Sequence, residues 1–169
     1  MEKEIINKVA QSDLVAVNLE DFYQKGERVL FDLKGWLFEE LILKEKDFRE
    51  QVKNHDWFQY QNKFVAITCT ADAIIPTWAF MLVASSLNPF AQKIVFGDLK
   101  KLEEEIFSEQ IQKLNIENYR GAKVMIRGCS HIDVPVSAYV ELMTRLRSVA
   151  KSIMYGDACS TVPLFKSKD

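Results

Sequence analysis

From about residue 60 onward, short apolar runs alternate with longer segments of helical spacing. Three of the short runs are rich in branched side chains, as buried strands are, and they cover residues 64–69, 93–96 and 123–127. A longer segment with helical spacing follows each of them, and the first of these segments is apolar on all sides over residues 78–84. Such alternation is typical of a parallel sheet, so the pattern predicts an α/β fold with a mainly parallel sheet and helices on both faces.

The expected helices have recognisable ends. The first is predicted over residues 76–87, where Pro76 suits the first helical turn. The second follows Asp98, which can accept hydrogen bonds as an N-cap. The third is predicted over residues 135–155, with Gly156 placed to end it. Its apolar stripe consists of Tyr139, Leu142, Met143, Leu146, Val149, Ala150 and Ile153.

The first 60 residues have a weaker pattern. Residues 14–19 and 28–33 alternate like strands, and residues 45–55 resemble a charged surface helix. We therefore expect an N-terminal strand pair beside the parallel core. No internal repeat or linker is apparent, and 169 residues suit one unit, so the chain is predicted to be a single domain over residues 1–169.

Charge and hydropathy argue against nucleic acid and membranes as partners. Twenty-two Lys and Arg residues against 24 Asp and Glu give a net charge of -2, without the basic excess that nucleic acid requires. The charged first eight residues do not resemble a signal peptide, which predicts a cytoplasmic protein. Residues 73–92 lack charged side chains, but Asn88 and Pro89 would break a helix there, so no membrane partner is expected.

Three cysteines are the main candidates for chemistry. Cys69 and Cys129 each follow a predicted strand, and ligands of parallel sheets bind at the carboxyl ends of strands. If both strands belong to one core, we expect these two residues within about 10 Å of each other. With His131, and with Cys159 if the tail turns back, they would form a tetrahedral site for zinc or iron, including an iron–sulfur cluster. Asp72 is an alternative fourth ligand or base.

A reactive thiol is the second hypothesis. Cys129 would lie near a helix N-terminus and near His131, and both would lower its thiol pKa. Asp133 could orient the imidazole. The alternative is that the cysteines are small buried hydrophobes, with His131 an ordinary loop residue and Asp133 a helix cap. The chain would then be a non-enzymatic interaction or scaffold module, and whether it is an enzyme stays open.

Four stretches of the sequence resemble an uncharacterised bacterial family, domain of unknown function 2480. They are residues 43–50, 73–79, 127–130 and 151–163, and the resemblance extends over nearly the whole chain. It implies a one-domain cytoplasmic protein but no activity, cofactor or catalytic residue. Members are often encoded beside genes for iron–sulfur cluster assembly. The resemblance thus favours thiol or metal handling, with a protein partner from that assembly process. Separately, the apolar helix over residues 78–84 could form a homodimer interface, although its burial inside the monomer is the simpler account.

Overall fold

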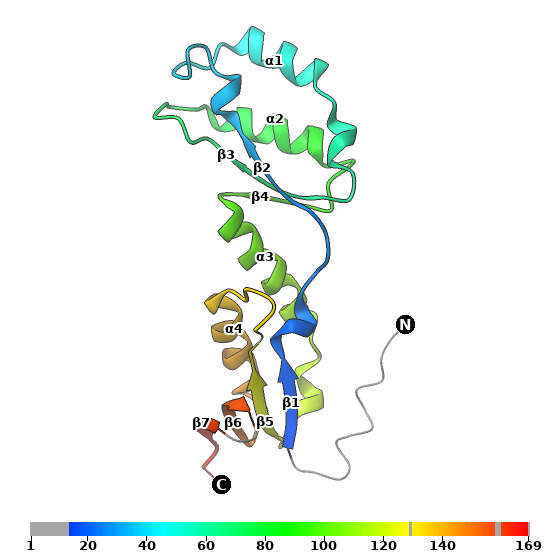
Figure 1. Ribbon diagram of the computed structural model, residues 1–169, viewed down its shortest axis with the longest axis vertical. Coiled ribbons are helices and arrows are strands. Elements are labelled where there is room, and N and C mark those ends of the chain that lie inside the picture. The colour runs from blue at the N-terminus through cyan, green and yellow to red at the C-terminus, as the bar shows by residue number, and fades with distance from the viewer. Residues whose placement is uncertain (1–13, 129, 158–159, 169) are drawn as a thin grey trace. The chain divides into compact units, whose positions relative to one another are not determined.

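The computed structural model describes residues 14–128, 130–157 and 160–168 (Figure 1). Their contacts fall into two compact units, each with its own sheet. Unit 1 holds the described parts of residues 1–23 and 107–169, and unit 2 is Gln24–Ile106. The α/β class is therefore confirmed, and the strands lie in two sheets.

Unit 2 contains a three-stranded parallel sheet in the order β2-β3-β4, with bounds Arg28–Asp32, Phe64–Thr68 and Lys93–Phe96. The first four residues of the central strand β3 are buried, because both faces of the sheet are covered. On one face Val65 and Ile67 pack in a cluster with residues of α1 (Glu45–Asn54) and α2 (Thr77–Leu87). On the other face its Phe64 and Ala66 pack with Leu102 and Ile106, the first-half residues of α3 (Leu99–Gln112).

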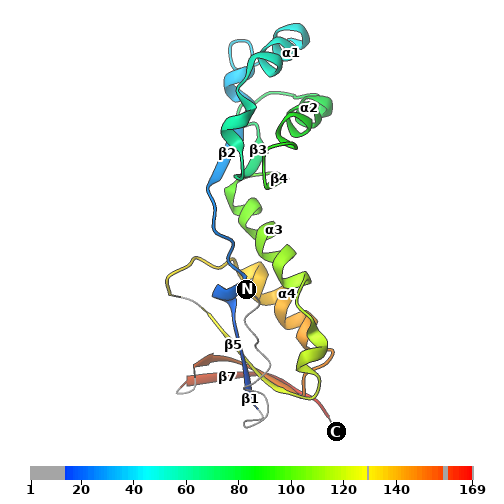
Figure 2. The ribbon, with the colours of Figure 1, turned by 90° about the vertical axis from the view of Figure 1, so that its right-hand side faces the viewer.

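Unit 1 contains a four-stranded sheet in the order β1-β5-β6-β7. The strands β1 (Leu14–Asn18), β5 (Lys123–Arg127) and β6 (Ser152–Asp157) are parallel, and β7 (Ser160–Lys166) returns antiparallel beside β6. One face packs against the second half of α3 and against α4 (Val136–Leu146), which lie on the same side of the sheet (Figure 2).

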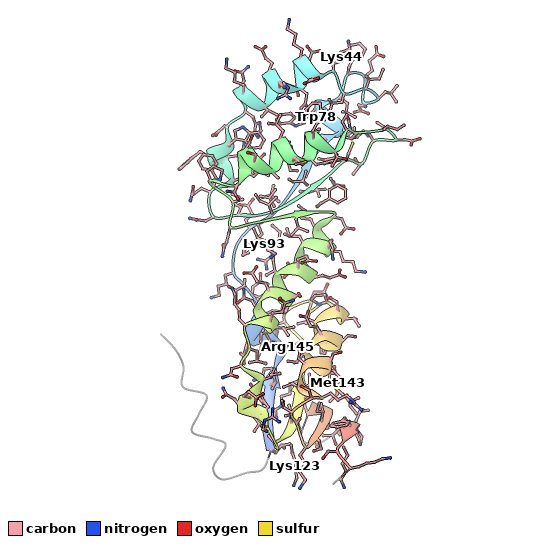
Figure 3. The ribbon with its side chains drawn as sticks, turned by 180° about the vertical axis from the view of Figure 1, so that it is seen from behind. Lys44, Trp78, Lys93, Lys123, Met143 and Arg145 are labelled. Atoms are coloured by element: carbon pink, nitrogen blue, oxygen red, sulfur yellow. The ribbon has the colours of Figure 1, made fainter. Side chains whose placement is uncertain are left out.

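Helix α4 also caps the end of α3. The guanidinium of Arg145 donates hydrogen bonds to the carbonyl oxygens of Ile111 and Leu114, and Figure 3 labels this side chain on α4. The Ile111 carbonyl also accepts the backbone N–H of Leu114, so the arginine adds a second donor there and links the end of α3 and the turn after it to α4.

The structure corrects the expectation of one sheet. The strand that ends before Cys69 is β3 of unit 2, whereas the strand that ends before Gly128 is β5 of unit 1. Both N-terminal strands exist, but β1 pairs with β5 and β2 pairs with β3, so they do not pair with each other. Apolar alternation shows that a segment is a strand, but it does not identify the neighbouring strand. The single-domain prediction concerns the behaviour of both units together and stays a prediction.

The long helix expected over residues 135–155 is also corrected. Helix α4 ends at Leu146, a turn follows, and Ile153 lies on strand β6. The helical spacing continued because Val149, Ala150 and Ile153 still face the same core as the helix. Gly156, with a φ of 124°, belongs to the strand that leads into β7 and does not end a helix. The helices expected over 45–55, 76–87 and after Asp98 are confirmed as α1, α2 and α3.

The two units repeat one order of elements, which overturns the expectation that the chain has no repeat. From the 3-10 helix Trp57–Tyr60 to β4, each element of unit 2 starts 59 residues before its counterpart in unit 1, as β3 does before β5. Long-range backbone hydrogen bonds repeat as well, since Asn62 N–H donates to the carbonyl of Phe90 and Gly121 N–H donates to that of Val149.

The repeat has little sequence identity. Over residues 57–98 and 116–157, only ten positions carry the same residue. Most of them are core or turn positions that any such unit requires, which explains why the sequence pattern hides the duplication. The identical positions in unit 2 are Tyr60, Val65, Ile67, Pro76, Ala79, Leu87, Ala91, Ile94, Gly97 and Asp98.

Candidate functional site

A polar cavity of about 530 Å³ lies at the carboxyl ends of β1, β5 and β6 in unit 1. This is the edge where ligands bind in parallel sheets, because the strand ends and the following loops converge there. The lining comes from three strand ends, the 3-10 helix Leu19–Phe22 and one loop, and it includes charged, amide and hydroxyl groups. It consists of Asn18, Glu20, Arg127, Gly128, Ser130, His131, Tyr155, Gly156 and Asp157.

Arg127 supplies a donor in this cavity. Its Nε is buried and makes no hydrogen bond within the described part of the chain. The nearest carboxylate oxygen, Oδ1 of Asp157, is 3.9 Å away, which is too long for a hydrogen bond. A buried donor left without an acceptor costs about 1–3 kcal/mol, so this nitrogen favours an acceptor that reaches it from a ligand or from water.

Two tyrosines form one wall of the site. The rings of Tyr139 on α4 and Tyr155 on β6 meet edge to face, with centroids 5.9 Å apart. Their hydroxyls converge on Gly128, because a Cβ added there would lie 2.8 Å from the Tyr139 hydroxyl and 3.2 Å from that of Tyr155. The absence of a side chain at Gly128 thus makes room for both hydroxyls.

The same two rings line a second, apolar cavity of about 390 Å³. Its other walls come from the end of β5, from α4 and from β7. Tyr155 is common to the two cavities, and Gly128 of the polar cavity lies against the hydroxyls of both tyrosines. The apolar cavity is lined by Ile126, Val136, Tyr139, Met143, Tyr155 and Leu164.

The corresponding edge of unit 2 is tied by hydrogen bonds. Asp32, which matches Asn18 at the end of the first strand, accepts the backbone N–H of Thr70 at 3.0 Å and its hydroxyl at 2.5 Å. It also accepts the N–H of Lys34 at 2.9 Å. Burial raises the pKa of Asp32, but the hydrogen bonds from Thr70 and Lys34 outweigh burial and lower it below the ordinary value of 3.8.

The aromatic pair at the edge of unit 2 consists of phenylalanines, where unit 1 has tyrosines. Phe80 and Phe96, the counterparts of the two tyrosines, meet edge to face with centroids 5.1 Å apart. They lack hydroxyls, and the counterpart of Gly128 is Cys69, which has a side chain. Hydroxyls and the space for them therefore occur together in unit 1 and are both missing from unit 2.

The structure describes only some of the site residues that the sequence predicted. His131 lines the polar cavity and is exposed. Cys129 and Cys159 lie outside the described residues, so their distances from other groups, including the expected 10 Å to Cys69, are not tested. Cys69 has a free thiol, is half-buried and packs against the core of unit 2, while Asp72 and Asp133 are exposed. Residue 135, not Asp133, is the N-cap of α4, without a side-chain hydrogen bond.

Sequence reasoning missed Asn18, Glu20, Arg127 and the tyrosine pair. The position of Arg127 at the end of an apolar strand was the one available signal. Within the described residues, no group of three His, Cys, Asp or Glu side chains could hold a metal ion. In the same residues no helix is long and apolar enough to cross a membrane.

The comparison with protein families matches a family model over residues 3–167, nearly the whole chain. The chain belongs to the family described as protein of unknown function DUF2480. No curated protein and no solved structure matches the chain. The family resemblance inferred from the four sequence stretches is therefore confirmed, and the family itself assigns no activity to this edge.

Proposed function

We propose that the carboxyl edge of unit 1 handles thiol, metal or iron–sulfur chemistry, with Cys129 as its central residue. The observation that supports this proposal is the polar cavity, since its lining includes His131 and the two sequence neighbours of Cys129, Gly128 and Ser130. An imidazole beside a thiol lowers the thiol pKa and is also a common metal ligand. In this proposal Cys159 is the second thiol.

Cys69 has a different role in this proposal. It follows β3, in the sheet of unit 2, so the one-sheet argument that joined it to Cys129 no longer applies. Its place after β3 nevertheless makes it a matched control, because the turn that contains Cys129 follows β5, the equivalent strand. We treat Cys69 as a structural residue of the unit 2 core.

Native-state alkylation tests the thiol proposal. The folded protein is treated with iodoacetamide from pH 5 to 9, and the modified cysteines are quantified by mass spectrometry. We expect Cys129 to react at a lower pH than a free thiol with a pKa of roughly 8.5 does. His131→Gln should slow this reaction near pH 7. An unchanged pH profile in His131→Gln, or a Cys129 that reacts like a thiol of the unfolded chain, would contradict the proposal.

Elemental analysis tests the metal form of the proposal. Full-length protein purified anaerobically without added metal is assayed for zinc and iron. We expect a stoichiometric signal that Cys129→Ser abolishes and Cys69→Ser retains. If both variants and the parent protein are free of metal, the zinc and iron–sulfur proposals fail, and only the reactive thiol remains for the alkylation experiment to decide.

A protein-interaction or scaffold role is the second candidate. Three large apolar side chains of unit 2, Phe58, Met81 and Phe96, are about two-thirds exposed and are therefore accessible to a partner. The partner in this case is a second copy of the chain or a protein of iron–sulfur assembly. Light scattering on the wild type and on Phe96→Ser would detect the homodimer, which the variant should weaken.

A further inference from the structure

We propose that the two cavities of unit 1 together bind one amphipathic carboxylate, with its head in the polar cavity and its aliphatic chain in the apolar cavity. The proposal concerns the same edge as the thiol or metal site but needs neither a thiol nor a metal. It starts from the fact that Tyr155 lines both cavities.

The tyrosine pair fits the junction between the two parts of such a ligand. The rings of Tyr139 and Tyr155 line the apolar cavity, while their hydroxyls lie against Gly128, which lines the polar one. Tyrosine is suited to such a boundary because one end is apolar and the other forms hydrogen bonds.

Arg127 is the group that selects an anionic head. Arg127 lines the polar cavity, and its Nε has no hydrogen-bond acceptor among the described residues. Its ion pair with Asp157 is long, at 3.9 Å, and a guanidinium pairs well with a carboxylate. Two carboxylates, Glu20 and Asp157, also line the polar cavity. The side chain of Asp157 is 84% exposed, so solvent screens its charge far more than that of a buried group. Glu20 is exposed as well.

Unit 2 has the same order of elements but lacks the tyrosines, the glycine and the arginine of this site. Its matching aromatic pair is Phe80 and Phe96, its counterpart of Gly128 is Cys69, and its counterpart of Arg127 is Thr68. The guanidinium and the two phenol hydroxyls are thus specific to unit 1. Unit 2 also lacks a counterpart of β7, the strand whose Leu164 completes the apolar cavity.

Titration with decanoate tests the proposal. The full chain is titrated by isothermal calorimetry with sodium decanoate below its micelle-forming concentration, and with acetate and decyltrimethylammonium as comparison probes. Acetate has the head without the chain, and decyltrimethylammonium has the chain with the opposite charge. We expect decanoate to bind at least tenfold more tightly than either comparison probe.

Variants separate the head from the chain. Arg127→Gln should weaken decanoate binding at least tenfold, whereas Arg120→Gln, which removes the same charge from an exposed pair with Glu117, should not change it. Met143→Trp should weaken binding to a similar extent by filling the apolar cavity; Figure 3 labels Met143 on α4.

The double variant Tyr139→Phe with Tyr155→Phe tests the role of the two hydroxyls without disturbing the fold. Because the Phe80 and Phe96 rings of unit 2 pack in the same edge-to-face manner, this variant should keep its circular dichroism spectrum. It should still lose at least threefold in decanoate affinity.

No decanoate binding, equal affinity for the cationic probe, or unchanged affinity in Arg127→Gln would overturn the proposal. None of these results bears on the alkylation of Cys129, so the two proposals fail separately.

Discussion

Asp32 accepts both the backbone N–H and the hydroxyl of Thr70, at 3.0 and 2.5 Å, although the two residues are 38 positions apart. The contact joins the end of β2 to the loop after β3. Since Asp32 also caps the N–H of Lys34, one carboxylate holds together three segments of the unit 2 edge. The corresponding residue of unit 1, Asn18, lines the open polar cavity instead.

Replacing this carboxylate should destabilise the protein. Asp32→Ala leaves the two N–H groups and the Thr70 hydroxyl without their acceptor, and the loss of such a cap costs about 1–2 kcal/mol. Urea unfolding at pH 7 measures it. The control is Asp47→Ala, at an exposed position in the first turn of α1. It should lower the free energy of unfolding by less than Asp32→Ala does.

The same carboxylate gives a pH dependence. Because the folded protein lowers the pKa of Asp32 below 3.8, the folded state binds this proton less readily than the unfolded state does. The stabilisation is therefore complete well above pH 3.8 and is lost as the pH falls through the folded pKa. The stability difference between wild type and Asp32→Ala should shrink in acid. A difference that stays constant from pH 7 to pH 3 would contradict this assignment.

A side chain at Gly128 should destabilise the protein, because the Tyr139 hydroxyl must move to make room for it. A Cβ there would lie 2.8 Å from the Tyr139 hydroxyl, closer than real Cβ atoms approach, so Gly128→Ala should cost about 1–3 kcal/mol. The cost should fall when Tyr139→Phe removes the hydroxyl, as in unit 2, where Cys69 coexists with Phe80. A double-mutant cycle of urea unfolding should show a coupling of about 0.5–3 kcal/mol. Strict additivity of the two substitutions would contradict the packing of the pair over Gly128.

These features show where the sequence was informative. Apolar runs located β3, β4 and β5, and a proline located the start of α2, because local patterns fix local structure. They did not assign β3 and β5 to different sheets, since strand pairing depends on distant residues. The strand β6 was missed because Ile153 continues the helical spacing of α4 onto the same core.

The candidate site was partly predictable for the same reason. The rule that ligands bind at carboxyl edges pointed to the loops after the predicted strands, and Gly128 and His131 of one of these loops line the polar cavity. The rule does not show which of two similar sheets has the cavity. Asn18 and Tyr155 could not be found by spacing, because the sheet brings them to the edge from distant parts of the chain.

His55 should make the stability of the protein depend on pH near neutrality. Its ring lies among Phe31, Trp36, Trp57 and Tyr60, with centroid distances between 4.7 and 5.8 Å, and its Nε2 is 2.9 Å from the Tyr60 hydroxyl. Burial lowers the pKa of His55 below 6.5, and the charge of Asp56 opposes this shift only in part. The unfolded chain therefore takes up this proton at a higher pH than the folded protein does.

The sign of the His55 effect follows from this difference in proton uptake. Stability should be highest above pH 6.5, where the imidazole is neutral in both states, and should fall as the pH drops from 6.5 toward the lower pKa of the folded protein. Chemical unfolding at pH 8 and at pH 5 measures the change in wild type and in His55→Gln. Any packing lost in the variant lowers its stability at both pH values. The relevant quantity is therefore the difference in stability between pH 8 and pH 5, which should be smaller in His55→Gln. An equal or larger difference in the variant would show that other groups produce the pH dependence.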